Sequence, residues 1–418
     1  MASGLRVFTR SPEVDRNAQP WLGPHRRVRA LGVCKQGAVA ALRGRRSAAK
    51  SSSPKTSVVP TVKVATAKGW PAGAKPVAAE GTSVAAFALG LEHPRWLYVL
   101  PNGDVLVAET NAPPRPEDAK GIKGKFFKHY QKKAGGAAPS ANRITLLRDT
   151  DGDGRSGDTL HLHRRAERAV RHDAGRQYVL RGECRLAGQV PYSPGQTQIS
   201  AAPVKVADLP GGPINHHWTK NVIANADGSK LYVAVGSNSN VAENGIEGRG
   251  RARRGLGDRR PPRARIACLR PVSGIPSAWR GSRRPVRLWV AVNERDELGS
   301  DLVPDYMTSV RDGGFYGWPY SYYGQHVDER VKPPRPDLVA KAIPPDYALG
   351  PHTASLGLAW ASATSLPPRF EHGMFVGQHG SWNRQPRSGY KVIFVPFAGG
   401  HPSGELIDVL TGFLTPRG

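Results

Sequence analysis

Two short motifs carry side chains suited to proton transfer and to cation binding. The segment "GGPINHHWTKN" places His216 and His217 beside Trp218, on a loop that enters an apolar run. A histidine pKa lies near neutrality, so this pair offers a general base; the alternative is a surface or structural histidine. The segment "VNERDELGSDLVPDY" holds a cluster of acidic residues: Glu294, Asp296, Glu297, Asp301 and Asp305. Because Ca²⁺ prefers carboxylates and loop carbonyls, this segment is either a hard-cation site or a plain polar loop.

A second acidic segment, "RDTDGDG", carries Asp149, Asp151 and Asp153, followed by Gly154. Its spacing resembles the start of an EF-hand loop. The twelfth position, however, is Leu160, where an EF-hand has a bidentate glutamate. The sequence therefore favours a Ca²⁺-binding or plain Asp-Gly turn between strands over a true EF-hand.

Later loops offer cations and aromatic rings that could hold a ligand. "GPHTASLGLAW" contains His352, and "GQHGSWNRQPRSGYK" contains His379, Arg384 and Arg387. Arginines between strands could clamp a multiply charged anion, although each one alone is equally typical of a solvated surface. The stretch "DGGFYGWPYSYYGQH" fits either core packing or the wall of a pocket for a flat ligand. The sequence has no Walker loop, GxSxG elbow or GxGxxG-plus-acid pattern, so hydrolase and nucleotide-binding classes have no support.

These motifs lie between segments that predict short β-strands. In "WLYVLPNGDVLVAET", two apolar runs flank Asn102-Gly103, and this pair predicts a hairpin with a type I′ turn. "NVIANADGSKLYVAVGS" repeats that design, and "VRLWVAVNE", "GMFVGQHG" and "YKVIFVPF" predict further strands. Repeated antiparallel units over about 340 residues favour an all-β propeller of ~4–8 blades, with a large β-sandwich as the alternative. "KGKFFKHYQKKAG" predicts one short inserted helix.

The formal net charge of +27 is unevenly distributed. Three windows, residues 1–56, 161–190 and 249–287, hold 29 of the 42 arginines and only 6 of the 33 acidic residues. The rest of the chain has a net charge of +1, so the bulk of the protein is not a basic, nucleic-acid-binding type. Each window also holds one of the three cysteines, a scattered set that excludes a disulfide framework and a CxxC metal site.

The most basic stretch runs from Arg249 to Arg265, "RGRARRGLGDRRPPRAR". It has three interpretations: a solvated loop, a nucleic-acid contact, or residues for which the fold was never selected. The windows lack interleaved aromatic residues and known nucleic-acid motifs. We therefore expect no nucleic-acid partner, and keep nucleic-acid binding as an alternative that predicts a steep salt dependence.

The ends of the chain carry little targeting information. Residues 57–80 are rich in Ser, Pro, Lys and Ala and predict an extended lead-in. No apolar run approaches the ~20 residues of a membrane helix, so no transmembrane segment is expected. No signal peptide is visible, because the N-terminus lacks an apolar core, and at face value the chain would stay in the cytoplasm.

Six motifs, in order, resemble one known family. They are "LEHPRWLYVLPNGDVLVAETNAPP", "SANRITLLRDTDGDG", "GGPINHHWTKN", "VNERDELGSDLVPDYMTSV", "GGFYGWPYSYYGQH" and "GPHTASLGLAW". The sequence is similar to the sorbosone dehydrogenase branch of the pyrroloquinoline quinone (PQQ)-dependent soluble glucose/sorbosone dehydrogenase family, over most of residues 57–160, 191–248 and 288–418. The resemblance implies a six-bladed β-propeller that holds PQQ and Ca²⁺ near its axis.

The resemblance also implies a reaction, partners and a location. An aldose, or the hydrate of an aldehyde sugar, would lose two electrons to give a lactone or acid, with hydride transfer to the quinone. The reduced cofactor would pass electrons to an external acceptor, a quinone or a cytochrome. Family members of this kind usually work outside the cytoplasmic membrane, so the resemblance implies a periplasmic or membrane-associated enzyme.

Matching motif by motif implies roles for individual residues. His217 matches the catalytic base, and Asp296 lies close to the reacting sugar. In the "NERDEL" loop, the carbonyls of Glu294 and Arg295 match Ca²⁺ ligands, and Glu297 would serve a second, structural Ca²⁺. The cofactor-binding positions are matched by Arg95 in "HPRWL", Arg270 in "CLRPVSG", His352 and Arg384.

The family pattern breaks down within the basic windows. In 161–190 two alternating strands are missing, and in 249–287 only "CLRPVSG" stands where the family has a Leu-Arg-Asn-Pro-x-Gly turn. Our hypothesis is a set of compensating frameshifts, either sequencing errors or real lesions, in a GC-rich gene. The chain then divides into an anomalous segment 1–56, the lead-in 57–80 and a propeller domain 81–418. With two blades disrupted, we expect the 418-residue chain to be inactive or to aggregate. A calcium-dependent propeller lactonase is a further alternative, which would need Ca²⁺ but no quinone.

Overall fold

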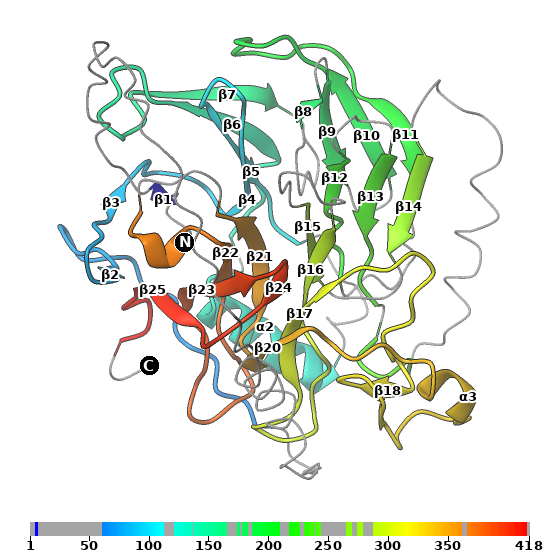
Figure 1. Cartoon of the computed structure of the whole chain (residues 1–418). Helices are drawn as coiled ribbons and strands as arrows, with labels where there is room; N and C mark the ends of the chain where they lie inside the picture. The colour runs from blue at the N-terminus through cyan, green and yellow to red at the C-terminus, as the bar shows by residue number, and fades with distance from the viewer. Residues whose placement is uncertain are drawn as a thin grey trace, which may run out of the picture.

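The computed structural model shows a chain built almost entirely from β-strands (Figure 1). It describes residues 5–6, 61–112, 121–136, 138–164, 174–175, 178–182, 186–209, 217–225, 230–237, 239–243, 265–269, 274–278, 287–361 and 366–415. The prediction of an all-β fold is confirmed. Within these residues, no helix is long and apolar enough to cross a membrane.

The first sheet contains the predicted hairpin. Its strands, in order, are β4 (Pro94–Val99), β5 (Val105–Glu109), β6 (Arg143–Arg148) and β7 (Asp158–Arg164). The hairpin joins β4 to β5, but its turn is not type I′, because only Gly103 has a positive φ, at 90°. Pro101 precedes Asn102 and fixes a negative φ, which favours a type I turn closed by a left-handed glycine. The helix α2 (Gly121–Lys133) lies between β5 and β6 and confirms the predicted insertion.

Two further sheets follow along the chain. The second has the order β11-β10-β9-β8, from β8 (Ala174–Gly175), β9 (Tyr178–Gly182), β10 (Leu186–Pro191) and β11 (Val204–Asp208). The third contains β12 (Val222–Ala224), β13 (Lys230–Ala234) and β14 (Arg265–Leu269). Strands β12 and β13 form the second predicted hairpin, whose turn lies outside the described residues.

The C-terminal half forms two larger sheets. The fourth has the order β15-β16-β17-β20, from β15 (Gly274–Ala278), β16 (Leu288–Val292), β17 (Pro304–Ser309) and β20 (Tyr347–Pro351). The fifth has the order β2-β25-β23-β22-β21, from β2 (Val77–Ala78), β21 (Ser355–Trp360), β22 (Gly373–Gln378), β23 (Lys391–Ala398) and β25 (Ile407–Thr411). Strand β2, from the lead-in, pairs with β25, so residues from both ends of the chain share one sheet.

Short elements complete the described structure. Strand β1 (Leu5–Arg6) pairs with β3 (Ala85–Ala86), β18 (Ser321–Tyr322) pairs with β19 (His326–Val327), and β24 (His401–Pro402) pairs with β23. The remaining helical turns are α3 (Pro336–Val339) and η3 (Pro368–Phe370).

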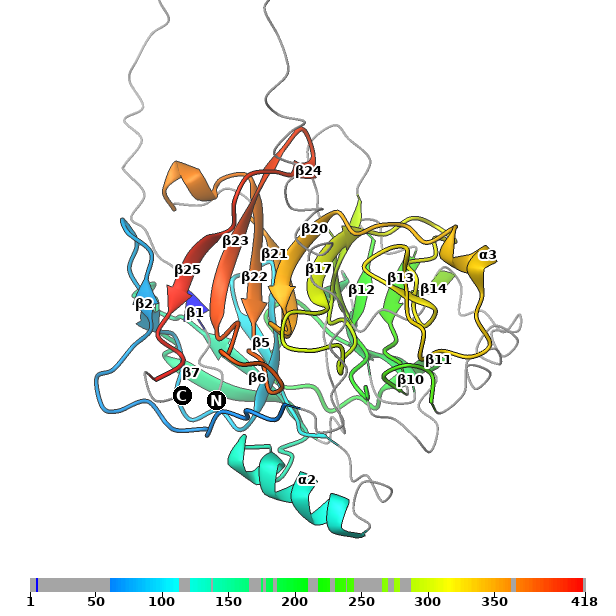
Figure 2. The same cartoon turned by 90° about the horizontal axis from the view of Figure 1, so that it is seen from below.

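Neighbouring sheets pack face to face in chain order (Figures 1 and 2). One buried cluster joins the first sheet to the second through Leu146, Leu162, Val179 and Val190, among others. Equivalent clusters join the second sheet to the third, and the fourth to the fifth. Strands buried on both faces, such as β5 and β16, read as continuous apolar runs for this reason. The described residues thus form five sheets of three or more strands in the manner of a propeller, and a count of six blades stays a prediction.

Two of the basic windows contribute strands to the described fold. Strands β9 and β14 fall in the windows 161–190 and 249–287. Strand β14 pairs with β13 in parallel, whereas the other described pairs are antiparallel. A meander of successive strands joined by short turns produces antiparallel neighbours, so this pair departs from propeller geometry. The predicted disruption of two blades stays a prediction, because most of residues 249–286 lie outside the described chain.

Candidate active site

His217 has the geometry of a general base. It precedes β12, and its Nδ1 lies 2.5 Å from the carbonyl oxygen of Ser237 and 3.3 Å from the Ser237 hydroxyl. A carbonyl only accepts hydrogen bonds, so Nδ1 carries the ring proton and Nε2 carries the lone pair. The side chain is solvent-exposed, and Nε2 is then the basic nitrogen of the ring, as the predicted role of general base requires.

A buried lysine fixes the loop that carries this histidine. Lys220 is only 1% exposed, and its Nζ donates to the carbonyl oxygen of His217 at 3.0 Å. No sequence pattern predicts this role, since a lysine next to a strand is usually solvated. Two tight contacts therefore hold His217, one to its ring and one to its backbone.

Arg95 and Trp218 form the adjacent wall. The Arg95 guanidinium lies 4.9 Å from the centroid of the Trp218 ring, a cation–π distance. Trp218 is 4% exposed and packs against Ala112, on the loop that follows β5. The predicted cofactor arginine thus contacts the residue that follows the predicted base, although Arg95 and His217 are more than a hundred residues apart in the sequence.

His379 and His93, to which the sequence motifs assign no specific role, lie close enough to Arg95 to feel its charge. Burial lowers the pKa of His379, and the positive charge of Arg95 and that of His93 lower it further. Burial and then the charge of Arg95 also lower the pKa of His93. His379 is exposed to solvent although burial among neighbouring groups lowers its pKa, which is the situation of a side chain in a concave surface. Its backbone N–H donates to Ala354, so it lies beside the His352 loop.

The loop that follows β13 connects the His217 side to the Asp296 side. The Ser237 hydroxyl donates to the carbonyl oxygen of Ser239. Asn240 then pairs with the backbone of Asp296, accepting from its N–H at 2.9 Å and donating to its carbonyl at 3.1 Å. Loops that belong to different sheets therefore meet at one end of the strands, as expected for the functional end of a propeller.

Asp296 and His352, predicted in separate motifs, are in contact. The Nδ1 of His352 lies 3.4 Å from Oδ1 of Asp296, and its Nε2 lies 2.9 Å from the carbonyl oxygen of Gly299. Burial favours the neutral ring, but the hydrogen bonds to Asp296 and Gly299 outweigh it and raise the pKa of His352. Asn383 donates to the same carboxylate at 2.7 Å. His352 thus ties the loop together through hydrogen bonds that favour its protonated form.

The "NERDEL" loop uses its charged side chains mainly to hold itself in place. Arg295 has a fully buried side chain that donates to Asp328 at 2.9 Å and to the carbonyl oxygens of Pro319 and Ser321. Glu294 accepts from the Arg295 guanidinium at 3.2 Å. Burial raises the pKa of Asp305 to about 7, against the hydrogen bonds it accepts, first from the Glu294 N–H. The Ca²⁺ ligands predicted here are backbone carbonyls, and these side-chain contacts fix that backbone.

Two further predicted residues, Arg384 and Glu297, lie on or beside the loop that carries Asp296. Arg384 donates from all three nitrogens to the protein, to Ser300, Pro386 and Asp301. The Glu297 carboxylate is 63% exposed and lies 3.9 Å from Arg330. Their predicted roles toward cofactor and Ca²⁺ stay predictions. Arg270 and His216 lie outside the described residues.

The aromatic segment contributes to the core at this end of the fold. Tyr322 and Tyr323 are 6% and 7% exposed and pack with Val290 and Leu302. The indole N–H of Trp318 donates to the carbonyl oxygen of Asn240 at 3.0 Å. Core packing therefore accounts for the buried tyrosines, and Trp318 supports the loop that holds Asp296.

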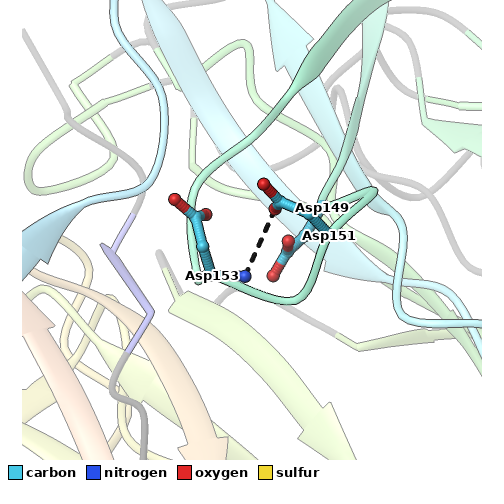
Figure 3. Close-up of side chains that lie close together, drawn as sticks. All are labelled: Asp149, Asp151 and Asp153. Atoms are coloured by element: carbon cyan, nitrogen blue, oxygen red, sulfur yellow. Dashed lines mark hydrogen bonds between the residues drawn. The ribbon is translucent and has the colours of Figure 1, made fainter.

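The separate acidic turn after β6 brings three carboxylates together (Figure 3). One carboxylate oxygen from each of Asp149, Asp151 and Asp153 lies within 4.8 Å of the other two. Among the described residues, this cluster has the spacing that could hold a metal ion. Asp149 accepts from the backbone N–H groups of Gly152 and Gly154 at 2.8 and 3.1 Å. The turn is formed by these local hydrogen bonds, and both of its interpretations stay open.

Comparisons with known proteins agree with this architecture. A family model described as TrAA12-like matches residues 337–410. Over 57 residues, 14% of this chain, the sequence is 42% identical to a PQQ-dependent pyranose dehydrogenase of Coprinopsis cinerea, and spans 7% of that protein. Over 106 residues it is 28% identical to an uncharacterised protein of Borreliella burgdorferi, and spans 28% of its length. The chain thus matches only a part of the curated relatives.

The similarity in structure extends much further than the similarity in sequence. The holo PQQ domain of the Coprinopsis cinerea pyranose dehydrogenase aligns over 82% of this chain and 88% of its own, with a TM-score of 0.57 and 18% identity. A calcium structure of a Trichoderma reesei protein of carbohydrate-active enzyme family AA12 aligns over 81% and 87%, with a TM-score of 0.59 and 15% identity. The described residues therefore share their fold with this PQQ domain and with the AA12 protein.

The residues at the site fit such a cofactor and cation. Arg95 presents an exposed guanidinium beside an aromatic ring, which suits a planar ligand that carries carboxylates. Asn383 has a buried Oδ1 without a hydrogen-bond partner, next to Asp296, and so offers an unused acceptor at the site. Carbonyl and amide oxygens of this kind are the ligands that Ca²⁺ prefers.

Proposed function

We propose that this protein is built for PQQ-dependent oxidation of an aldose or aldehyde sugar, of the sorbosone or glucose type, to a lactone or acid. The observation that carries the proposal is the meeting of His217, Arg95 and Asp296 on adjoining loops of a fold shared with PQQ-dependent dehydrogenases. Six blades, and assignment to the sorbosone branch, belong to this proposal.

His217 supplies the proton transfer. With Nδ1 held by the Ser237 carbonyl, Nε2 takes the proton of the sugar hydroxyl at the carbon that is oxidised. PQQ, when bound, accepts the two electrons of the C–H bond as hydride. Asp296, paired with His352 and Asn383, orients the sugar beside that base.

The rim residues hold the cofactor and the cation. Arg95 would bind a carboxylate of PQQ and stabilise negative charge, together with Arg270, His352 and Arg384. The carbonyl oxygens of Glu294 and Arg295 would hold Ca²⁺, and Glu297 would serve a second, structural Ca²⁺. The electrons leave to an external quinone or cytochrome, and the enzyme works in the periplasm or at the membrane surface.

The test compares two versions of the chain. One is the 418-residue protein as given; the other has the alternative reading frame restored across residues 161–190 and 249–287. Each is loaded with PQQ and Ca²⁺, and sugar-dependent reduction of a dye is measured. We expect activity in the restored chain and little in the chain as given.

Each outcome has a distinct meaning. Activity in both chains supports the proposal and overturns the expectation that the 418-residue chain is inactive, whereas inactivity of both overturns the proposal. Hydrolysis of a lactone with Ca²⁺ alone, without any quinone, would replace it with the lactonase alternative. Resequencing the gene decides whether an alternative frame with an "LRNP"-like turn exists at all.

A further inference from the structure

The inserted helix α2 is the most lysine-rich element of the fold. Five of the 18 lysines of the chain lie within its 13 residues, and it contains no acidic residue. This contrasts with the near-neutral balance outside the basic windows, because α2 does not belong to any of the three windows. The charge of α2 is therefore a separate feature that the frameshift hypothesis does not explain.

The charges gather on one face of the helix. Lys125, Lys128, His129 and Lys132 are exposed, and their spacing of three and four residues aligns them along one side. We call these four residues the cationic stripe. At 1.5 Å per residue it extends for about 10 Å, more than a single small anion covers. Like charges at this spacing repel one another, so a negatively charged partner would relieve the repulsion.

The helix is fixed beside the candidate active site. Asn111 donates to the carbonyl oxygens of Gly136 and Ala138 at 3.1 and 2.5 Å, and its neighbour Ala112 packs on Trp218. The lead-in adds a second attachment, since the N–H of Ala67 donates to the Lys133 carbonyl at 2.9 Å. In Figure 2, α2 stands clear of the sheets, so its outer side is open to another molecule.

We propose that the cationic stripe docks an acidic, one-electron-accepting protein next to the site, an inference that rests on the proposed function. Oxidation of one sugar releases two electrons and two protons. Two molecules of an oxidised haem protein would each take one electron in turn, and the protons would pass to water. Position favours this partner over an anionic lipid surface. The segment that follows α2 is held by Asn111, and its neighbour Ala112 packs on Trp218 beside Arg95, on the side of the site where the proposed reaction would release the electrons.

The test measures binding and electron transfer separately. The probe is an oxidised, acidic c-type cytochrome, and a basic c-type cytochrome is the control ligand. Binding to the immobilised 418-residue chain at low salt is compared with binding to the K125E/K128E/K132E variant. We expect the variant to bind the acidic cytochrome at least about tenfold more weakly. The difference should vanish near 1 M salt, where the Debye length is about 3 Å.

A matched variant controls for total charge. K75E/K332E/K341E changes three exposed lysines outside α2 by the same amount and should bind as the unaltered chain does. Equal binding by all three chains overturns the proposal. Stripe-dependent binding to phosphatidylglycerol vesicles without binding to the cytochrome also overturns it, in favour of a membrane surface.

Dye reduction by the PQQ-loaded protein distinguishes this proposal from the proposed function. Dye-linked activity should be equal in the restored chain with and without the stripe substitutions, because a small dye needs no docking. If stripe-dependent cytochrome binding is present but dye-linked activity is absent in the restored chain, the docking surface stands and the assigned reaction fails.

Discussion

The two sides of the candidate site are built differently. On the His217 side, a solvent-exposed imidazole is held by the Ser237 carbonyl, and its backbone is held by Lys220. On the Asp296 side, His352 and Arg295 are buried and each contacts several partners within the protein. The first side offers a lone pair to a substrate, whereas the second commits its charges to holding loops.

The comparison teaches that similar residue types can carry opposite roles. With Ser237 at Nδ1, Nε2 is the basic nitrogen of the His217 ring, whereas a carbonyl and a carboxylate together raise the pKa of His352. The kind of partner and the burial, rather than the residue type, separate a catalytic group from a positioning group. The predictions below test this division, from the largest expected effect to the smallest.

The largest effect is expected at His217. In the chain with the restored reading frame, His217→Gln should reduce kcat/KM of the PQQ-loaded protein by about 10²–10⁴, since a general base contributes that much. Stability should change by no more than about 1 kcal/mol, the worth of one hydrogen bond. Steady-state kinetics and urea unfolding measure the two quantities. His372→Gln, at an exposed histidine outside the site, is the control and should leave both unchanged. Full activity in His217→Gln would remove the distinction between the two sides.

Arg295 should show the reverse pattern. Arg295→Met leaves Glu294 and Asp328 buried without their shared cation, a change that typically costs about 3–5 kcal/mol. Chemical denaturation measures the free energy of unfolding. Arg330→Met is the matched control, because the Arg330 side chain is 23% exposed, and it should cost less. An Arg295 variant as stable as Arg330→Met would show that the buried pairs do not hold this side together.

The sequence could predict strands better than contacts. Alternating and continuous apolar runs located β5, β16, β22 and β23, because strand formation depends on a local pattern. It could not predict that Pro101 changes the hairpin turn, because two adjacent preferences compete there. The roles of Lys220 and Asn240 depend on partners that only the packing of different sheets brings near. The acidic residues of the "NERDEL" loop predict a cation site. They do not predict the buried contacts of Arg295, because its partners Pro319 and Asp328 are distant in the sequence.

Removal of Ca²⁺ tests the Asp296 side from another direction. If backbone carbonyls of Glu294 and Arg295 bind Ca²⁺, a Ca²⁺ concentration one hundred times its Kd should raise the free energy of unfolding by about 2.7 kcal/mol. Removing the ion with EGTA should abolish that stabilisation. Thermal unfolding in EGTA, with and without added Ca²⁺, measures the change. Asp149→Asn with Asp151→Asn removes acidic ligands of the separate turn and serves as the control. If the Ca²⁺ effect disappears in that control, the ion acts at the turn after β6 and not at the site.

The smallest effect is expected in the ionisation of the concave surface beside His217. Burial, Arg95 and His93 lower the pKa of His379, so Arg95→Met should raise that pKa towards 6.5. NMR titration of the His379 ring measures the change, and Arg369→Met should have none. A histidine whose folded pKa lies below 6.5 binds fewer protons than in the unfolded chain, so its contribution to stability falls as the pH drops below 6.5. Arg95→Met should weaken that acid sensitivity. An unchanged His379 pKa would mean that Arg95 and His379 do not share one low-dielectric surface, and the His217 side would then lack the electrostatic setting that its chemistry requires.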